Sequence, residues 1–336
     1  MTTRTAPALS DHLAAPLRIG EPDVHGPLAV FPLFGPAPRL EYVSFAHGRA
    51  LGATIKELEQ RASVNDLLVL NPANTAILLY EGEEVLGAQQ NRTFDVSVLV
   101  GARSQLQVPV SCVEAGRWDG RRHAEAFSPS PQAAYPAMRS MKNRATRESM
   151  AAGGPARAVQ GDVWAEVASK SARMNVHSAT GAMNDVYDGR RERLGEFLAA
   201  THLRDGQRGA LVQIAGRPTV LDHVSRPSVF AQLFAPLVQG YALDALEAPL
   251  DGHDPDPAAA ADFLDCVAQS RVSEHDGIGL GRDLRFAQEG VAGAGLVAGD
   301  ELVQLTAFPE SGTGEAAADT PIPGARIRRP SRRRAS

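Results

Sequence analysis

In the stretch QVPVSCVEAGRW, residues 107–118, an apolar run is followed by a cysteine, a glutamate, an arginine and a tryptophan, which are residue types that can bind ligands or take part in catalysis. The run predicts a strand, and strand alternation then places Cys112 and Glu114 on one face, after a row of valines. A carboxylate there needs a cation or several donors, because burying an unpaired charge is costly. Arg117 can supply the cation, and the Trp118 ring can stack on its guanidinium. Two interpretations stay open: a site displayed at a strand end, or a structural Glu–Arg clamp with Cys112 as a small core residue.

A second polar concentration precedes this stretch, in YEGEEVLGAQQNRTF, residues 80–94. Two glycines bracket a predicted turn and strand there. The segment is rich in carboxylates, amides and a guanidinium, namely Glu81, Glu83, Glu84, Gln89, Gln90, Asn91 and Arg92. Such groups suit a ligand with hydroxyls, a carboxylate or a phosphate, because an arginine fork matches oxyanions and amides bond donors and acceptors alike. The alternative is a hairpin with a solvated polar face.

Other signatures of catalysis are weak. The sequence contains no GxGxxG after a strand, no GxxxxGK[ST], no HExxH and no GxSxG. The nine histidines are scattered, and the acidic segments at 251–256 and 274–276 are typical of solvated turns, so we predict no metal site. His223 precedes a predicted helix and could face a cleft, although a core or surface position is commoner. Cys112 would be a nucleophile only beside a base that lowers its pKa, and the sequence offers none.

The composition limits the possible classes of protein. The chain has 336 residues, 43% of them hydrophobic and 22% charged, as in soluble globular proteins. A net charge of −5 gives the folded chain no electrostatic footprint for nucleic acid. Two cysteines are too few for a disulfide framework or a thiolate zinc site. No signal peptide and no run of about 20 apolar residues is present. We therefore expect a cytoplasmic protein without a membrane or nucleic-acid partner.

Residues 26–118 are expected to form a β-rich unit. Short β-branched runs punctuated by Gly, Asn and Pro predict an antiparallel sheet there, with a sandwich as one possible form. In TFDVSVLV, residues 93–100, the alternation predicts a single strand with one apolar face, formed by Phe94, Val96, Val98 and Val100.

Residues 119–308 are expected to be helical and mixed. Residues 121–160 are rich in Pro, Ser and Arg and predict a long surface excursion with short helical pieces. Helices capped by Asp162 and Ser228, others over 184–201 and after 254–257, and three strands in 280–308 should follow. We therefore predict an α+β protein with one domain, 26–308, between a flexible lead-in, 1–25, and a disordered tail, 309–336, whose basic end has an open role.

Taken together and in this order, the two polar clusters resemble the ARPP domain family, named for its association with ADP-ribosylglycohydrolase and rhodanese-phosphatase-superfamily proteins. The resemblance is firm over residues 64–118, and it continues at QGDVWAEVA and ELVQLTAF, so that it spans most of the predicted domain. Where the family pattern reads GAKQNR, this chain has Gln89 in place of the lysine. That change removes one potential contact to an anion.

The resemblance implies no settled activity, cofactor or protein partner. The family's association implies a ligand related to ADP-ribose or NAD. We predict that one pocket for such a ligand is lined by residues at the strand ends, namely Glu83, Gln90, Asn91, Arg92, Glu114 and Arg117. Arginines would contact its oxyanions and the Trp118 indole would stack on a ring, so that the ligand-binding residues are Gln90, Asn91, Arg92, Cys112, Arg117 and Trp118. A separation of Arg92 and Glu114 beyond about 15 Å, far outside hydrogen-bond reach, would exclude the shared pocket.

Two further functions stay open. The first is an enzyme that acts on the same class of metabolite, with Glu114 or Glu83 as general acid–base. The second is a protein–protein adaptor, which would have no pocket and would expose a contiguous apolar patch. The sequence specifies neither a cofactor nor an oligomeric state.

Overall fold

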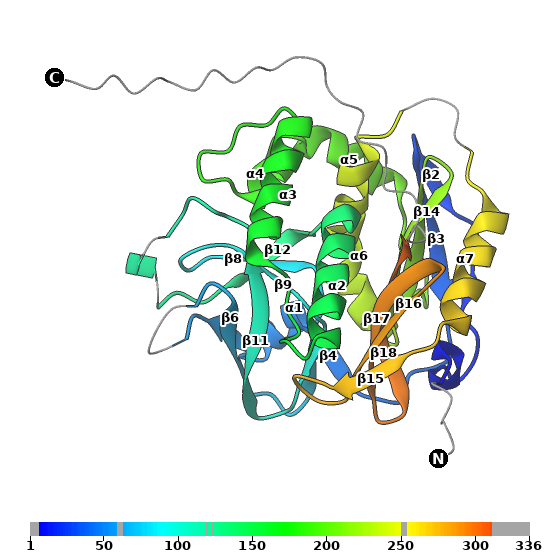
Figure 1. The fold of residues 1–336 in the computed structure, drawn as a ribbon, viewed down its shortest axis with the longest axis horizontal. Helices are drawn as coiled ribbons and strands as arrows, with labels where there is room; N and C mark the ends of the chain where they lie inside the picture. The colour runs from blue at the N-terminus through cyan, green and yellow to red at the C-terminus, as the bar shows by residue number, and fades with distance from the viewer. Residues whose placement is uncertain (1–6, 59–62, 119, 123, 250–253, 311–336) are drawn as a thin grey trace.

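The computed structural model describes residues 7–58, 63–118, 120–122, 124–249 and 254–310. These residues form an α+β fold with mainly antiparallel sheets, which confirms the predicted fold class (Figure 1). The tail that we predicted to be disordered lies almost wholly outside the described residues. No helix within the described ranges is long and apolar enough to cross a membrane.

The largest sheet has nine strands in the order β1-β3-β13-β14-β18-β17-β16-β15, with β2 paired to β3. The strands are β1 (Arg18–Ile19), β2 (Asp23–His25), β3 (Leu28–Phe34), β13 (Gly209–Ile214), β14 (Arg217–Val224), β15 (Ser273–Asp276), β16 (Arg282–Gln288), β17 (Gly290–Ala298) and β18 (Glu301–Glu310). Helix α6 (Pro227–Ala245) packs on one face of this sheet, and α7 (Pro257–Gln269) packs on the other (Figure 1). Alternate side chains of the central strands are therefore buried on both faces.

Two smaller sheets build the strand-rich half. One has the order β12-β8-β9-β11-β6-β5, and the other has the order β10-β7-β4. Their strands are β4 (Tyr42–Ser44), β5 (Thr54–Lys56), β6 (Asp66–Asn71), β7 (Ala76–Leu79), β8 (Glu83–Leu86), β9 (Arg92–Phe94), β10 (Val98–Val100), β11 (Ser104–Cys112) and β12 (Ser128–Ala133). Both sheets contribute to one apolar core, which makes this half sandwich-like. Only the β4–β7 pair is parallel among the described pairs of these two sheets.

The prediction of one strand over residues 93–100 was wrong. Strand β9 ends at Phe94, and β9 and β10 belong to different sheets. Asp95 lies at the break and is buried, and its carboxylate accepts hydrogen bonds from Ser111 Oγ (2.6 Å) and Ala158 N (3.2 Å). It also lies 3.0 Å from Lys142 Nζ. A buried carboxylate with three partners, one on β11 and two from the chain after Trp118, thus takes the place of continued strand pairing.

The predicted surface excursion over 121–160 was also wrong, because its centre is the buried helix α2 (Pro136–Ala151). Arg139 and Lys142 on this helix are 0% and 1% exposed. The other helical segments are η1 (Leu9–His12), α1 (Phe45–Ala50), η2 (Gly120–Arg122), α3 (Gln160–Arg173), α4 (Met183–Asp188) and α5 (Arg191–Ala200).

Helix starts differ from those that we predicted. Val159 and Arg226, rather than Asp162 and Ser228, are the N-cap residues of α3 and α6, and neither makes a side-chain cap hydrogen bond. Asp256 does cap α7, since its carboxylate accepts from Ala259 N. Part of the segment that we expected to be a loose lead-in also carries η1, β1 and β2.

Arg139 of α2 is the centre of a buried polar network between the strand-rich half and the large sheet. Its Nη1 donates to Asp222 Oδ2 (2.9 Å), and its Nε donates to Glu81 Oε1 (3.0 Å). The hydroxyls of Tyr80 and Tyr241 each donate to Asp222 at 2.6 Å. Burial alone would raise the pKa of Asp222, but Arg139 and the two hydroxyls hold that pKa below its usual range. The network is therefore a fully paired charge cluster in the core.

Gly82 makes room for this arginine. Its φ is +82°, and a Cβ at this position would lie 2.7 Å from Arg139 Cδ. We expect Gly82→Ala to lower the free energy of unfolding by about 1–3 kcal/mol in urea titrations, because strain at positive φ and displacement of Arg139 add together. Gly206→Ala is the control, since Gly206 has a φ of +71° with nothing within 4 Å of its added Cβ. Equal losses in the two variants would mean that packing of Arg139 does not require the glycine.

Candidate functional site

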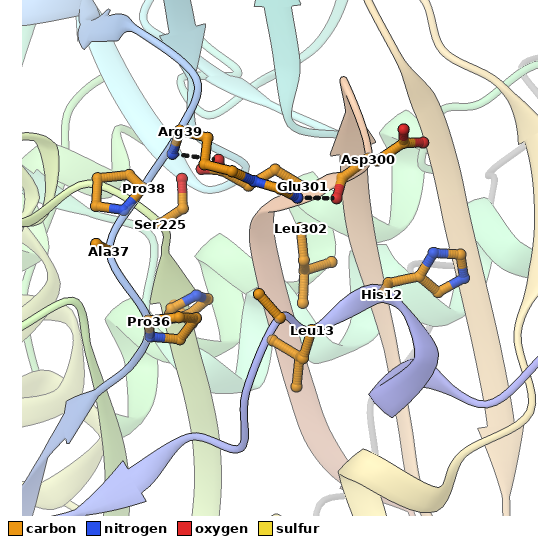
Figure 2. Close-up of a pocket in the computed structure, with 12 residues that line it drawn as sticks. His12, Leu13, Pro36, Ala37, Pro38, Arg39, Ser225, Asp300, Glu301 and Leu302 are labelled. Atoms are coloured by element: carbon orange, nitrogen blue, oxygen red, sulfur yellow. Dashed lines mark hydrogen bonds between the residues drawn. The ribbon is translucent and has the colours of Figure 1, made fainter.

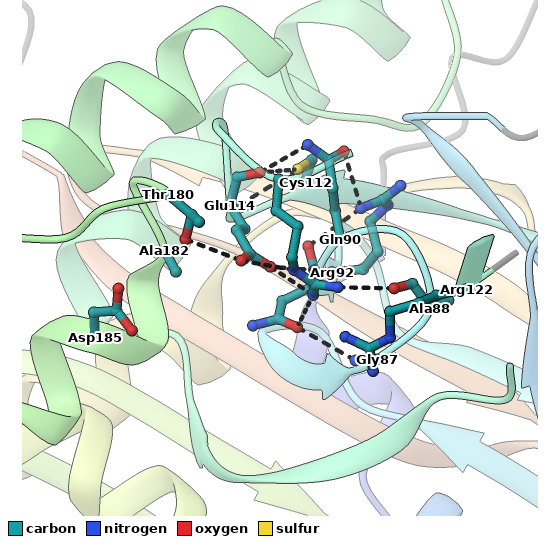
Figure 3. Close-up of polar contacts among 12 residues, drawn as sticks. Gly87, Ala88, Gln90, Arg92, Cys112, Glu114, Arg122, Thr180, Ala182 and Asp185 are labelled. Carbon is teal, nitrogen blue, oxygen red and sulfur yellow. Dashed lines mark hydrogen bonds and ion pairs between the residues drawn. The ribbon is translucent and has the colours of Figure 1, made fainter. Parts of the chain in front are cut away.

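Strands β8, β9 and β11 lie side by side and bring the two polar segments of the sequence together (Figure 3). In the sheet register Arg92 lies opposite both Val85 of β8 and Cys112 of β11. Glu114 follows two residues after Cys112, just beyond the end of β11. Side chains directly opposite one another on adjacent strands are neighbours. Most of the residues that the sequence suggested for a site therefore meet at one strand end.

Glu114 is the most heavily bonded residue of this cluster. Its Oε1 accepts from Arg117 Nε (2.8 Å) and Thr180 Oγ1 (3.0 Å), and its Oε2 accepts from Asn91 N (3.1 Å). Burial alone would raise the pKa of Glu114, but the bonds from Arg117 and Asn91 outweigh burial and lower it. Glu114 is therefore ionised at neutral pH.

Arg117 closes the cluster toward solvent. Its Nη2 lies 2.7 Å from Glu114 Oε2, its Nη1 donates to Ala88 O (2.8 Å), and its Nη2 also donates to Asn91 Oδ1 (3.0 Å). The Arg117 side chain is 20% exposed, whereas that of Glu114 is 6% exposed. The guanidinium thus ties together both polar segments and is the charged group by which the cluster reaches the surface.

Arg92 lies deeper and is 0% exposed. Its Nη1 makes long contacts to Gln90 Oε1 and Asn91 O, both at 3.4 Å. Its Nη2 lies 3.6 Å from Glu57 Oε1, which is an ion pair at more than hydrogen-bond distance. Neither Nε nor Nη2 of Arg92 has a hydrogen-bond partner within the described part of the chain. The buried guanidinium therefore has donors to spare.

Cys112 is bonded in a way that opposes nucleophilic chemistry. Its backbone N–H and carbonyl both bond the Gln160 side chain, each at 2.8 Å, and its thiol donates to Glu114 O at 3.3 Å. Burial raises the pKa of the thiol above its usual value, although Arg92 opposes the shift. A neutral, buried thiol is a poor nucleophile, so a packing role beside Arg92 fits Cys112 better.

Several predicted site residues thus belong to one network, namely Gln90, Asn91, Arg92, Cys112, Glu114 and Arg117. The side chain of Gln90 spans from Arg92 to the Glu114 carbonyl, to which its Nε2 donates at 2.8 Å. The large separation that would have excluded a shared site does not occur. Trp118, which we also predicted for the site, is not among these residues, and its side chain is 51% exposed.

Glu83 has a different environment from the cluster. Its Oε2 accepts from Tyr80 N at 2.7 Å, within the preceding turn, and burial raises its pKa to about 7. The carboxyl with the larger rise in pKa is that of its neighbour Glu84, which no sequence pattern distinguishes from Glu83. Glu84 is 2% exposed, and its Oε2 accepts from Ser130 Oγ and Gln132 Nε2, both at 2.8 Å.

Burial raises the pKa of Glu84 to about 8, and the charges of Glu114 and Asp188 add to that rise. One segment of chain bonds the Glu114 carboxyl directly and is connected to the Glu84 carboxyl through Gln132. Thr180 donates to Glu114, and four residues later Asn184 Oδ1 accepts from Gln132 Nε2 (2.7 Å), which also bonds Glu84. Glu84 is therefore protonated and Glu114 ionised at neutral pH, and the side chains of Thr180, Asn184 and Gln132 connect the two.

Thr180, Asn184 and Gln160 come from the chain after Trp118, and no local sequence pattern connects them to the strands. Within the described ranges, no group of three or more His, Cys, Asp or Glu side chains could hold a metal ion.

Comparison with known proteins gives one match. No curated protein and no solved structure matches the chain. A family description, "ARG and Rhodanese-Phosphatase-superfamily-associated Protein domain", matches residues 16–308. This range includes both polar segments, α2 and all of the large sheet except the last two residues of β18. The chain therefore belongs to the ARPP-1 family, as its two polar clusters indicated.

Proposed function

We propose that the cluster around Glu114 is a binding site through which a cytoplasmic domain senses a small, nucleotide-derived metabolite with an oxyanion. The observation that carries the proposal is the Arg92 guanidinium, which is fully buried and has two nitrogens without hydrogen bonds in the described part of the chain. An unmet donor in the interior costs about 1–3 kcal/mol, so a ligand oxygen that accepts from Arg92 would be stabilised strongly.

The route for such a ligand runs past Arg117. This side chain is the partly exposed member of the cluster, and a ligand oxyanion could take over contacts that Arg117 now makes to Ala88 and Asn91. Gln90 and Asn91 supply amide donors and acceptors beside it. The exposed Trp118 indole follows Arg117 directly and offers a face for a base or a nicotinamide ring.

The family's description supports the class of ligand. It names an association with ARG and with the rhodanese-phosphatase superfamily, and the ligand that this association favours is ADP-ribose or NAD. Gln89 stands where the family pattern has a lysine, so the site has one cation fewer for an anion. This favours a ligand with few charges over a polyphosphate.

A binding screen tests the proposal. We expect ADP-ribose or NAD at a hundredfold its Kd to stabilise the fold by about 2.7 kcal/mol in thermal unfolding. Arg92→Lys, which keeps the charge but removes the fork, should weaken binding at least about tenfold, or about 1.4 kcal/mol. Glu114→Gln should weaken it similarly by releasing Arg117. Nicotinamide without a phosphate should bind much more weakly.

Arg191→Ala is the matched control, because it removes a guanidinium whose side chain is 77% exposed on α5. Its affinity for the ligand should equal that of the wild type. Affinity that falls as much in this control as in Arg92→Lys would contradict the proposal. A flat screen, with both site variants merely destabilised, would make the cluster a structural clamp.

An enzyme acting on the same metabolite is the second candidate. The specific observation is the pair of carboxyl groups connected through Thr180, Asn184 and Gln132, with the Glu84 pKa raised to about 8 and that of Glu114 lowered. Environments that shift the pKa values of two carboxyl groups in opposite directions are typical of a general acid and a general base. In this reading Glu84, rather than Glu83, donates the proton. Turnover of the bound ligand, lost in Glu84→Gln with affinity kept, would distinguish the enzyme from the sensor.

An adaptor role has less support. The exposed large apolar side chains in the described residues come from separate parts of the chain, namely Val24, Leu51, Trp118, Val159, Leu203 and Leu280. The adaptor role would gain support if none of the ligands in the screen stabilised the fold.

A further inference from the structure

A second candidate site lies on the large sheet, away from the Glu114 cluster, under the N-terminal segment that precedes β1. A small cavity of about 30 Å³, which we call the polar cavity, is lined by His12, Arg39, His223 and Glu301 among others; Figure 2 labels His12, Arg39 and Glu301. An apolar cavity of about 340 Å³ is lined by Leu9, Leu17, Leu264, Val267 and Leu305, among others. Leu13 and Ala14 line both cavities.

The register of the sheet shows that the two cavities are neighbours. His223 of β14 lies directly opposite Leu305 of β18. The first lines the polar cavity and the second lines the apolar one. Gly35 marks the same junction, because a Cβ on it would lie 2.9 Å from Leu17 and 3.7 Å from the His223 ring. A single molecule can therefore place one end in each cavity.

Three side chains that line the polar end each have a buried atom without a hydrogen-bond partner in the described residues, namely those of His12, His223 and Glu301, and His12 Nε2 also lies 3.7 Å from Glu274 Oε1. Glu301 is 9% exposed, and its Oε2 accepts from Arg39 N (2.6 Å) and Leu40 N (3.0 Å). Its Oε1 and the Nδ1 of His223, which is 2% exposed, have no hydrogen-bond partner within the described residues. Burial, with Arg208 adding to it, lowers the pKa of His223 to about 3, so the imidazole is neutral. The cavity thus presents an acceptor that needs a donor, beside a ring that can donate or accept.

The volumes and charges narrow what can fill this space. About 10–15 Å³ of such space holds one water, so the polar cavity admits a group of two or three heavy atoms. Arg39 and Asp300 lie at its edge with opposite charges, and Glu301 faces Arg208 with opposite charge as well. An added cation therefore gains little, and an added carboxylate would meet Glu301. A neutral group that both donates and accepts fits best.

We propose that this pair of cavities binds a neutral primary amide with an apolar body. Its N–H donates to Glu301 Oε1, its other polar atom shares a hydrogen bond with His223 Nδ1, and its apolar part lies between Leu17, Val267 and Leu305. The segment above the cavities is anchored on one side by the bond from Leu9 N to Ser270 O (2.9 Å) and on the other by the bond from Gly20 N to Pro32 O (2.9 Å). Ala14, Ala15 and Pro16 between these anchors are exposed, which gives the ligand its route of entry.

Calorimetry on the full chain with head-group probes of one chain length tests the proposal. Hexanamide should bind, hexylamine should bind at least tenfold more weakly, and hexanoate should bind least. In Glu301→Gln the order of hexanamide and hexanoate should reverse, because the new amide donates to a carboxylate. That reversal is a result that a purely apolar cavity would not give.

Ala268→Phe fills the apolar cavity and should abolish hexanamide binding. Ala261→Phe makes the same change at an exposed position of the same helix, and it should bind as the wild type does. Circular dichroism of each variant establishes that it is folded. The head-group series uses the wild type, so its result holds even if one variant does not fold. Equal binding of hexanamide and hexanoate, unchanged binding in Ala268→Phe, or no binding of any probe would overturn the proposal, the last result leaving only ordered water in the cavities.

Discussion

Replacing Arg139 with methionine is expected to lower the free energy of unfolding by about 3–5 kcal/mol, the loss typical when one partner of a buried charge cluster is removed. Arg139 and Asp222 are both 0% exposed, and Glu81 is the second carboxylate on the same guanidinium. Methionine fills a similar volume, so the loss would report the two carboxylates left without their cation and not a cavity. Urea titration at pH 7 measures it.

A double-mutant cycle makes this test specific. Asp222→Asn alone should also be destabilising, and the combination with Arg139→Met should cost clearly less than the sum of the two, because neither charge is then left alone. Arg191→Met on the surface of α5 should stay within about 0.5 kcal/mol of the wild type. Additive losses in the double variant would show that Arg139 and Asp222 do not stabilise each other.

Stability is expected to fall as pH rises from about 5 to 8, with Glu84 contributing about 1.4 kcal/mol per pH unit. Burial raises the Glu84 pKa from its usual 4.5 to about 8 in the folded protein. Between these two values the folded protein holds a proton that the unfolded chain has lost. The contribution is therefore fully present below pH 4.5, and it is lost as pH approaches 8.

Glu84→Gln isolates this effect. Glutamine keeps hydrogen-bonding atoms for Ser130 and Gln132 but cannot ionise, so chemical denaturation at successive pH values should give a flatter profile than the wild type. At pH 8 the variant should be the more stable protein. Glu192→Gln, at an exposed position of α5, should leave the profile unchanged. Glu83, with a pKa of about 7, should keep part of the slope below pH 7 in this variant, so a slope between pH 7 and 8 that persists in Glu84→Gln would contradict the assignment.

The strand-end cluster could be predicted from sequence because its two segments lie on neighbouring strands. Strand alternation placed Cys112 and Glu114 on one face, and sheet pairing brought Arg92 beside them. The choice of Glu83 over Glu84 could not be made in the same way. Adjacent residues on a strand point to opposite faces, and which face is buried under Gln132 and Asn184 depends on elements from later in the chain.

Helix α2 could not be predicted for a related reason. Arg139 and Lys142 are residue types that are almost never fully buried unless they are paired. In a segment with proline, serine and further arginines they indicate a solvated surface. Their partners lie 83 and 47 residues away, at Asp222 and Asp95, as the numbering shows. Only the assembled fold supplies the charges that make such a helix a core element.

The placement of these two cations determines where the chain can be divided. Arg139 faces Asp222 of the large sheet and Glu81, whereas Lys142 faces Asp95 at the break between β9 and β10. A chain cut after Trp118 would keep Asp95 and Glu81 but lose both of their cations. The strand-rich half is then not a separable unit for expression. During synthesis its interior can be completed only after α2 has left the ribosome. Until then the carboxylates of Glu81 and Asp95 lack the cations Arg139 and Lys142 that pair with them in the folded protein.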